Sequence, residues 1–197
     1  YANGGFGKQE MFPSSDIDIS IIKNSNDIKN FDAIEKFIAK LWDSGFKIGH
    51  SVRTIKEVNQ ISKQDPKEFT SYLTNRPIIA DQKINTKLQK TLLDKWPKKK
   101  FFKAKILEQE LRHKSFFSTQ YNLEPNLKES PGGLRDFQNA LWILHHCFEL
   151  WDDVLILQSS DFGSLYKKTI NSYNFIKTLR YATNLIAKSN TLSFEFE

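Results

Sequence analysis

The stretch that decides the fold reads Gly4-Gly5-Phe6-Gly7-Lys8-Gln9-Glu10 and runs, a few residues later, into Ser15-Asp16-Ile17-Asp18. Glycines favour a flexible turn because they lack a Cβ atom. Side chains alternate along a strand, so Asp16 and Asp18 share one face while Ile17 and Ile19 share the other. The pattern therefore predicts a glycine turn followed by a strand that carries two neighbouring carboxylates on one face.

Two carboxylates held this close repel each other unless a cation lies between them. The cation that suits them is Mg²⁺, which proteins often bind through one or two carboxylates together with phosphate oxygens. The backbone at Gly4 and Gly5 lets a phosphate approach closely. We therefore predict that Asp16 and Asp18 bind metal and act in phosphoryl-type chemistry. The alternative is that both are solvated carboxylates at a strand end.

Composition sets bounds on the partners of this protein. The chain has 197 residues, with 29 Lys and Arg against 23 Asp and Glu, and its formal net charge is +6. That balance suits an anionic partner such as a nucleotide, whereas nucleic acid is not expected, because the basic run at Lys98-Lys99-Lys100 is interpreted as a solvated helix face. A single cysteine excludes a disulfide framework and indicates a reducing, cytoplasmic compartment. No apolar run is long enough to predict a membrane span.

Periodicity predicts an α/β part over residues 1–80. Alternation over residues 16–22 and again over 46–53 predicts two strands, and the helical spacing of apolar residues from Ile28 to Trp42 predicts a helix between them. Thr54 and Glu57 have capping-box spacing, which places the start of the next helix. Pro66 is suited to the first position of another helix.

The remainder, residues 81–197, is predicted to be all-helical. Helices are expected around residues 84–92, 99–119, 134–148 and 166–179. Residues 122–133 contain two prolines and two glycines, so we expect an ordered loop there. The amides of Gly132 and Gly133 precede a helix and could bind an anion, and Arg135 with Asp136 could form a buried pair that fixes this loop.

The motifs together resemble a known family. The glycine pair and the Asp16-Ile17-Asp18 motif resemble the nucleotidyltransferase superfamily. They are followed in order by Gly49-His50-Ser51-Val52-Arg53-Thr54 and by Tyr121-Asn122-Leu123-Glu124-Pro125-Asn126-Leu127-Lys128-Glu129-Ser130-Pro131-Gly132-Gly133-Leu134-Arg135-Asp136. In this order the segments are similar to the N-terminal part of bacterial PII uridylyltransferases, the bifunctional enzymes of nitrogen signalling.

The resemblance implies an α+β fold, with a nucleotidyltransferase-like mixed sheet followed by an all-α helical bundle. It implies a catalytic domain over residues 1–80, truncated at its N-terminus, and a helical domain over 81–197 that is incomplete at its C-terminus. The implied reaction transfers UMP from UTP to a tyrosine hydroxyl of the PII signal protein with Mg²⁺ and releases pyrophosphate. Two alternatives stay open: a related enzyme such as the adenylyltransferase of glutamine synthetase, and a nucleotide-binding or protein-docking module that has lost catalysis.

The resemblance also suggests further nucleotide contacts. Lys8, Ser15, Arg53 and Lys128 join Gly4 and Gly5 in the predicted nucleotide-binding set. Two departures bear on activity, because Lys47 and Thr74 stand where the family often carries acidic residues, and either loss could remove a third metal ligand or a base. The run His145-His146-Cys147 is interpreted as structural, since adjacent residues on a helix point in different directions.

Overall fold

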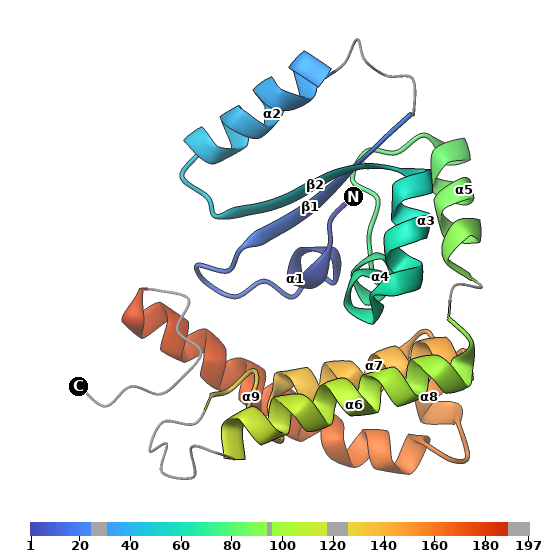
Figure 1. The fold of residues 1–197 in the computed structure, drawn as a ribbon. Helices are drawn as coiled ribbons and strands as arrows, with labels where there is room; N and C mark the ends of the chain where they lie inside the picture. Colours follow the sequence, from blue (N-terminus) through green and yellow to red (C-terminus); the bar gives the residue numbers. More distant parts are fainter. Residues whose placement is uncertain (25–30, 94–95, 118–125, 189–197) are drawn as a thin grey trace. The chain divides into compact units, whose positions relative to one another are not determined.

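The computed structural model describes residues 1–24, 31–93, 96–117 and 126–188. The chain divides into two compact units, Tyr1–Trp96 and Pro97–Glu197 (Figure 1). A small parallel sheet accompanied by helices gives the α+β class that the sequence predicted. No helix among the described residues is both long and apolar enough to cross a membrane.

Two parallel strands form the sheet of the first unit. β1 (Ile17–Lys23) pairs with β2 (Ile48–Thr54) in a register that runs from Ile17 opposite Ile48 to Lys23 opposite Thr54. Parallel neighbours need a crossover connection, which here contains α2 (Phe31–Asp43). Figure 1 shows α2 on one side of the strands and α1 (Gly4–Gly7) on the other. The two faces of the sheet therefore have different neighbours.

The first residues of the chain add an antiparallel partner to this sheet. Ala2, which is fully buried, forms isolated antiparallel bridges to Ile19 and to Arg76. The backbone of Tyr1 exchanges hydrogen bonds with Ser20, and Ala2 exchanges them with Arg76. The segment before the glycine turn is thus fixed between β1 and the chain after residue 75, which places the turn at the start of β1.

Helices α3 (Ile55–Gln64) and α4 (Pro66–Leu73) begin where the sequence placed them. The Thr54 side chain accepts a hydrogen bond from the Glu57 amide, and the Glu57 carboxylate accepts from the Thr54 amide, so the capping box is confirmed. Asp65 caps α4 through the amide of Lys67, and Pro66 occupies its first turn. These caps fix the point at which β2 ends.

Helix α5 (Gln82–Leu93) belongs to the first unit. It packs against α3 and α4, and buries Leu88 and Leu92. Trp96 is also buried, and its indole nitrogen donates to the carbonyl oxygen of Ser62 at 2.6 Å. The boundary between the compact units therefore falls at residues 96 and 97, whereas the expected domain boundary was at residues 80 and 81. The difference is α5, because periodicity shows that a helix is amphipathic but not which neighbour covers it.

Helices dominate the described residues of the second unit. α6 (Lys98–Phe117) packs on α7 (Leu134–Phe148), and α9 (Gly163–Ala187) packs on α7 and on α8 (Asp153–Gln158). The short helix α8 was not predicted, since one and a half turns give little periodicity. The buried side chains of this unit include Phe101, Leu134, Trp142, Ile156, Tyr166 and Tyr173.

Candidate functional site

The carboxylate of Asp18 lies between two glycines. A Cβ atom on Gly4 would lie 2.8 Å from Asp18 Oδ2, and a Cβ atom on Gly49 would lie 2.5 Å from Asp18 Oδ1. Gly49 is the partner of Asp18 in the β1–β2 register, and Gly4 has a φ of +53°, which favours glycine. Both positions must therefore lack a side chain if Asp18 is to keep this place.

Exposure alternates along the start of β1 as the sequence predicted. Asp16 and Asp18 are exposed, whereas Ile17 and Ile19 are half-buried. On the other face of the sheet, the ring of His50 lies 5.3 Å from that of Trp42 in an edge contact with α2. His50 thus contacts α2 on the opposite face of the sheet, away from the carboxylate face.

Polar side chains continue the carboxylate face along both strands. Ser20 is buried and lies two residues beyond Asp18, and its hydroxyl is 2.9 Å from that of Ser51, its partner in the register. The Asn3 side chain donates a hydrogen bond to Ser20 Oγ. Sequence reasoning missed this group, because Asn3 and Ser51 are both distant in sequence from Ser20. The three side chains tie the glycine turn to both strands.

The glycine turn itself is held by its surroundings. A Cβ atom on Gly7 would lie 2.7 Å from the Ala2 oxygen and 2.9 Å from the Thr74 oxygen. The Arg76 guanidinium donates to the carbonyl oxygens of Phe6 and Gly7 at 3.3 and 3.4 Å. Carbonyls at the end of a helical turn favour a cation in this position. The turn therefore depends on close backbone packing at Gly7 and on Arg76.

Lys8 and Ser15 lie on the segment that joins the turn to β1. Lys8 follows α1 directly and is half-buried. The amide of Ser15 donates to the carbonyl oxygen of Phe12 at 3.0 Å, immediately before Asp16. Gly5 lies within α1, and a Cβ atom there would lie 3.0 Å from the Glu10 oxygen. Their predicted contacts with a nucleotide stay predictions.

Arg53 has protein partners on α4. Its guanidinium forms an ion pair with Glu68 at 2.6 Å and donates to the Tyr72 hydroxyl at 3.1 Å. The hydrogen bond to Glu68 raises the pKa of Arg53, which stays protonated. A guanidinium has five N–H donors, so the bonds to Glu68 and Tyr72 do not use all the donors of Arg53. The predicted phosphate contact of Arg53 stays a prediction, and the structure adds that β2 is tied to α4 through it.

A third acidic ligand is absent from the described part of the chain. Among those residues, no group of three or more His, Cys, Asp or Glu side chains could hold a metal ion. Lys47 is exposed and its carbonyl accepts from the Ile17 amide, while Thr74 ends α4 and its hydroxyl donates to the Thr70 oxygen at 3.3 Å. Asp16 and Asp18, two exposed carboxylates that follow a glycine-rich turn, still fit Mg²⁺, since hard oxygen ligands suit this ion and phosphate oxygens can complete its coordination shell.

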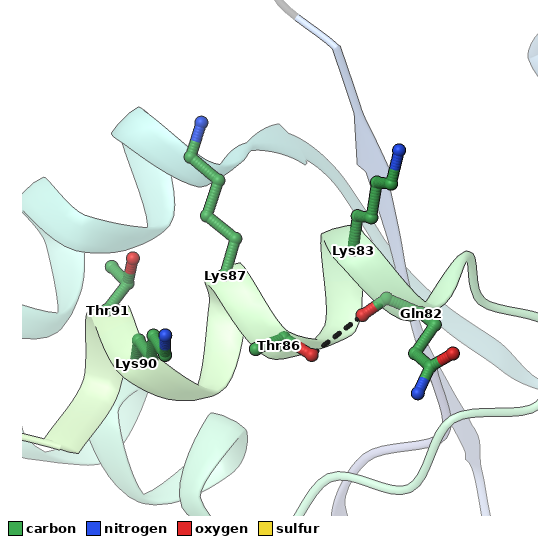
Figure 2. Close-up of a pocket in the computed structure, with 6 residues that line it drawn as sticks. All are labelled: Gln82, Lys83, Thr86, Lys87, Lys90 and Thr91. Carbon is green, nitrogen blue, oxygen red and sulfur yellow. Dashed lines mark hydrogen bonds between the residues drawn. The ribbon is translucent and has the colours of Figure 1, made fainter.

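A separate hollow runs along α5 in the same unit. It has a volume of about 650 Å³, and Figure 2 shows Lys83 and Lys87 extending from the helix to the same side. Its described lining residues are Gln82, Lys83, Thr86, Lys87, Lys90 and Thr91. None of these is a predicted site residue, so the hollow does not coincide with the carboxylate face of β1.

The predicted loop of the second unit is described from residue 126 onward, and residues 122–125 lie outside the described residues. The Asn126 side chain accepts from the amides of Lys128 and Glu129 at 3.0 and 2.8 Å. The Gly132 amide donates to Asp136 Oδ2 at 2.7 Å, and the Gly133 amide to the Ser130 oxygen. The Gly132 amide therefore has the chain's own Asp136 carboxylate as its acceptor, and the Gly133 amide has a backbone carbonyl, which corrects the prediction of an anion site at these two amides.

Asp136 does not pair with Arg135. It forms an ion pair with Arg112, and both of its oxygens lie 2.9 Å from His113 Nε2. Arg135 instead bonds to Gln138 at 3.1 Å and to Glu129 at 3.3 Å. Neighbouring helical residues point in different directions, which explains why the expected pair does not form.

The His145-His146-Cys147 run has structural contacts. The ring of His145 stacks on Trp151 at 5.6 Å, and that of His146 meets the edge of Phe101 at 4.7 Å. Cys147 Sγ lies 3.4 Å from the Lys98 oxygen, and burial raises the pKa of its thiol. The three side chains thus reach different neighbours, as the structural interpretation requires.

The comparisons with known proteins agree with the resemblance. Residues 100–197 match the family model described as GlnD PII-uridylyltransferase. The bifunctional uridylyltransferase/uridylyl-removing enzyme of Ectopseudomonas mendocina is 35% identical over 202 residues, which cover 100% of this chain and 22% of that protein. The enzyme of the same description from Hydrogenovibrio crunogenus is 38% identical over 191 residues, which cover 95% of this chain and 21% of that protein.

The chain thus spans about a fifth of the length of these curated relatives. No solved structure matches it. The likeness to the relatives includes both the carboxylate face of β1 and the loop before α7, because it extends over the whole chain. The chain belongs to the family of bifunctional uridylyltransferase/uridylyl-removing enzymes.

Proposed function

We propose that the first unit carries a nucleotidyl-transfer site that moves UMP from UTP to a tyrosine hydroxyl of the PII signal protein. The observation that carries this proposal is the place of the Asp18 carboxylate between Gly4 and Gly49, with Asp16 exposed nearby on the chain. The printed names of the relatives, which include uridylyltransferase, support the choice of reaction. The identity of the nucleotide, UTP, and of the acceptor protein, PII, is itself proposed.

Asp16 and Asp18 are the residues that would hold Mg²⁺. When bound, the ion supplies neutralising charge at the α-phosphate and at the leaving pyrophosphate. Gly4 and Gly49 keep side chains away from the carboxylate, so a triphosphate can approach it. Asn3, Ser20 and Ser51 hold the turn and the two strands in place, which positions both carboxylates.

The transfer is a substitution at phosphorus. The phenolic oxygen of the acceptor tyrosine forms a new bond to the α-phosphorus, while the bond from that phosphorus to the oxygen shared with the β-phosphate breaks. The electron pair of the broken bond leaves with pyrophosphate, and the phenolic proton passes to solvent. In this proposal, Lys8 and Ser15 contact phosphate oxygens, and Arg53 holds β2 on α4 and directs its remaining donors toward the nucleotide.

The test follows transfer of label from α-labelled UTP to purified PII, using the 197-residue chain with Mg²⁺. Asp18→Asn keeps the size of the side chain and removes its charge, so we expect transfer to fall by about a hundredfold or more, with an unchanged unfolding midpoint. Asp43→Asn, at the exposed end of α2, is the matched control and should keep full activity. Undiminished transfer by Asp18→Asn would overturn the assignment.

One observation favours a second candidate, a nucleotide-binding module without catalysis. Lys47 and Thr74 occupy positions that are often acidic in the resembling family, and the described residues offer no cluster of three ligands. In calorimetry, this alternative predicts Mg²⁺-dependent binding of UTP with no release of pyrophosphate. Replacing UTP with ATP in the same assay tests the adenylyltransferase alternative.

A further inference from the structure

Three lysines of α5 line the hollow of the first unit. Lys83, Lys87 and Lys90 lie within about 60° of one another around the helix axis, because residues three and four positions apart share a helix face. All three are exposed, and Figure 2 shows Lys83 and Lys87 extending to the same side. The rise along the helix separates Lys83 from Lys87 by about 6 Å. The hollow is therefore lined by a row of positive charges.

The charge of α5 differs from that of its neighbours in the first unit. Helices α2, α3 and α4 each carry basic and acidic side chains, whereas α5 has three lysines and no acidic residue. Within the described ranges of the chain, none of these lysines forms an ion pair, in contrast to Lys36 of α2, which lies 2.7 Å from Asp32. The described residues therefore leave this row of charges without a counter-charge in contact.

The row of lysines is unfavourable for the helix alone. Lys87 follows Lys83 by four positions and precedes Lys90 by three, and like charges at these spacings destabilise a helix. The helix dipole also disfavours Lys83 in the first turn, although it favours Lys90 in the last. A partner of opposite charge would remove this repulsion. Groups that lower the stability of the free protein in this way are typical of functional surfaces.

Neutral polar groups complete the described lining of the hollow, from Gln82, Thr86 and Thr91. The Thr86 hydroxyl donates to the Gln82 backbone oxygen at 2.9 Å, as Figure 2 shows, so the Thr86 oxygen can still accept a hydrogen bond. The Gln82 side-chain amide can both donate and accept. A peptide backbone also carries donors and acceptors, whereas an ionised phosphate group mainly accepts. The lining therefore suits a polypeptide better than a chain of phosphates.

The described lining contains neither an aromatic ring nor an arginine. Sites for single-stranded nucleic acid combine a basic groove with aromatic side chains on which bases stack. Arginine is the side chain whose fork geometry suits a phosphate group, whereas lysine is a point charge on a flexible stem. These two features favour carboxylates over nucleic-acid phosphates as the counter-charge.

We propose that the α5 hollow docks an acidic segment of another polypeptide along Lys83, Lys87 and Lys90. In an extended segment, side chains two residues apart lie on the same side at about 6.6 Å, close to the spacing between Lys83 and Lys87. Carboxylates at alternate positions of the segment would therefore meet successive lysines. The hollow, at about 650 Å³, has the size of a ligand site. The proposal goes beyond the transfer reaction and needs neither Asp16 nor Asp18.

The experiment measures the fluorescence anisotropy of a labelled ten-residue peptide that alternates glutamate with serine, mixed with the 197-residue chain. We expect binding at low ionic strength that weakens as NaCl is added, because salt screens exposed charges. The same peptide with glutamine in place of glutamate should not bind. Lys87→Gln should weaken binding about threefold, the usual size of one exposed ion pair, and the triple variant Lys83→Gln, Lys87→Gln, Lys90→Gln about tenfold or more.

A second triple variant controls for net charge. Lys99→Gln, Lys167→Gln and Lys168→Gln together remove three exposed lysines from the second unit, and this variant should bind the acidic peptide as the parent does. Equal weakening by the two triple variants would mean that net charge alone attracts the peptide, which would overturn the proposal.

Thermal unfolding without peptide separates a docking role from a role in folding. The α5 triple variant loses like-charge repulsion, so its unfolding midpoint should equal or exceed that of the parent while it binds the peptide more weakly. A lower midpoint together with unchanged peptide binding would show that the lysines serve the fold alone, and the proposal would fail.

Two further arms test the class of partner and the independence of the two proposals. If a labelled ten-nucleotide oligothymidylate binds as tightly as the acidic peptide and the α5 triple variant weakens that binding, the choice of a polypeptide is wrong. Asp18→Asn should bind the acidic peptide as the parent does, so failure of the proposed transfer and failure of docking are separate results. Absence of peptide binding at low ionic strength would also overturn the docking proposal.

Discussion

Asp18 and Asp136 are the same residue type in opposite surroundings. Asp18 is exposed on β1 beside two glycines, where no side chain can occupy the adjacent space. Asp136 on α7 is 17% exposed. It pairs with Arg112 and His113 and accepts a hydrogen bond from the Gly132 amide. The comparison teaches that the role of a carboxylate is set by its neighbours, since charged side chains and an amide contact Asp136, whereas Asp18 is exposed and is flanked by two glycines.

The largest effect is expected from filling the space beside Asp18. In Gly49→Ala, the new Cβ atom would meet Asp18 Oδ1 at 2.5 Å, so the carboxylate must move. A shift of about 1 Å at a reacting centre can cost about a hundredfold in rate, and we expect a loss of that size in the proposed UMP transfer. The fold should persist, because Gly49 has no positive φ.

Gly45→Ala is the control for this prediction. Gly45 has a φ of +79°, so alanine there strains the backbone, but a Cβ atom would meet nothing within 4 Å. The variant should be less stable and yet keep the parental rate of the proposed UMP transfer per folded molecule. Equal rates for Gly49→Ala and the parent would show that the place of Asp18 does not matter for transfer.

The next largest effect is expected on protein stability, at Asp136. Asp136→Asn removes the charge that Arg112 and His113 face, and leaves a largely buried guanidinium without its carboxylate. Breaking such a pair costs about 3 kcal/mol of unfolding free energy. Urea denaturation measures the loss, with the exposed Glu110→Gln on α6 as control. A change of a few tenths of a kcal/mol would mean that Asp136 has no structural role.

The smallest effect is expected at Glu57, an exposed carboxylate whose hydrogen-bond partner, Thr54, is only three residues away. Hydrogen bonds from the Thr54 amide and hydroxyl lower the pKa of Glu57, so the folded state favours the carboxylate form. This contribution is complete above the ordinary pKa of glutamate, about 4.3, and disappears as the pH falls through the lower folded value. Glu57→Gln should therefore lose less stability than the parent between pH 6 and pH 3.

Urea midpoints across that pH range test this expectation. Glu35→Gln, at an exposed position of α2, is the matched control and should follow the parent. If Glu57→Gln and the parent lose equal stability on acidification, the capping box does not depend on the charge of Glu57.

Local chemistry made much of the fold predictable. The alternation around Asp16 and Asp18 predicted β1, and the spacing of Thr54 and Glu57 predicted the start of α3. Both signals lie within a few residues, so they do not depend on the rest of the chain. The glycines at positions 4 and 5 likewise indicated a turn, although not that Gly4 and Gly49 flank one carboxylate from separate segments.

Long-range partners could not be predicted in this way. Glu68 lies fifteen residues from Arg53, and Arg112 lies twenty-four from Asp136, and nothing in the local pattern selects either pair. The sequence analysis predicted that Arg135 pairs with Asp136 because the two residues are adjacent. The side chains of adjacent residues on a helix point in different directions, so this pair does not form. The local pattern likewise did not predict that α5 lies in the first unit, because the helices that pack against it are distant in sequence.

The four tryptophans of the chain divide evenly between the units, and each unit buries one of its two. In the first unit, the Trp96 indole donates a hydrogen bond to the Ser62 carbonyl oxygen. In the second, the Lys105 ammonium lies over the face of the Trp142 ring. The fluorescence emission of a buried indole shifts to longer wavelength when unfolding exposes it to water. Replacing both tryptophans of one unit by phenylalanine would therefore leave a fluorescence signal from the other unit alone. Comparing the melting curves of the two double variants would reveal whether the units lose structure together or one after the other.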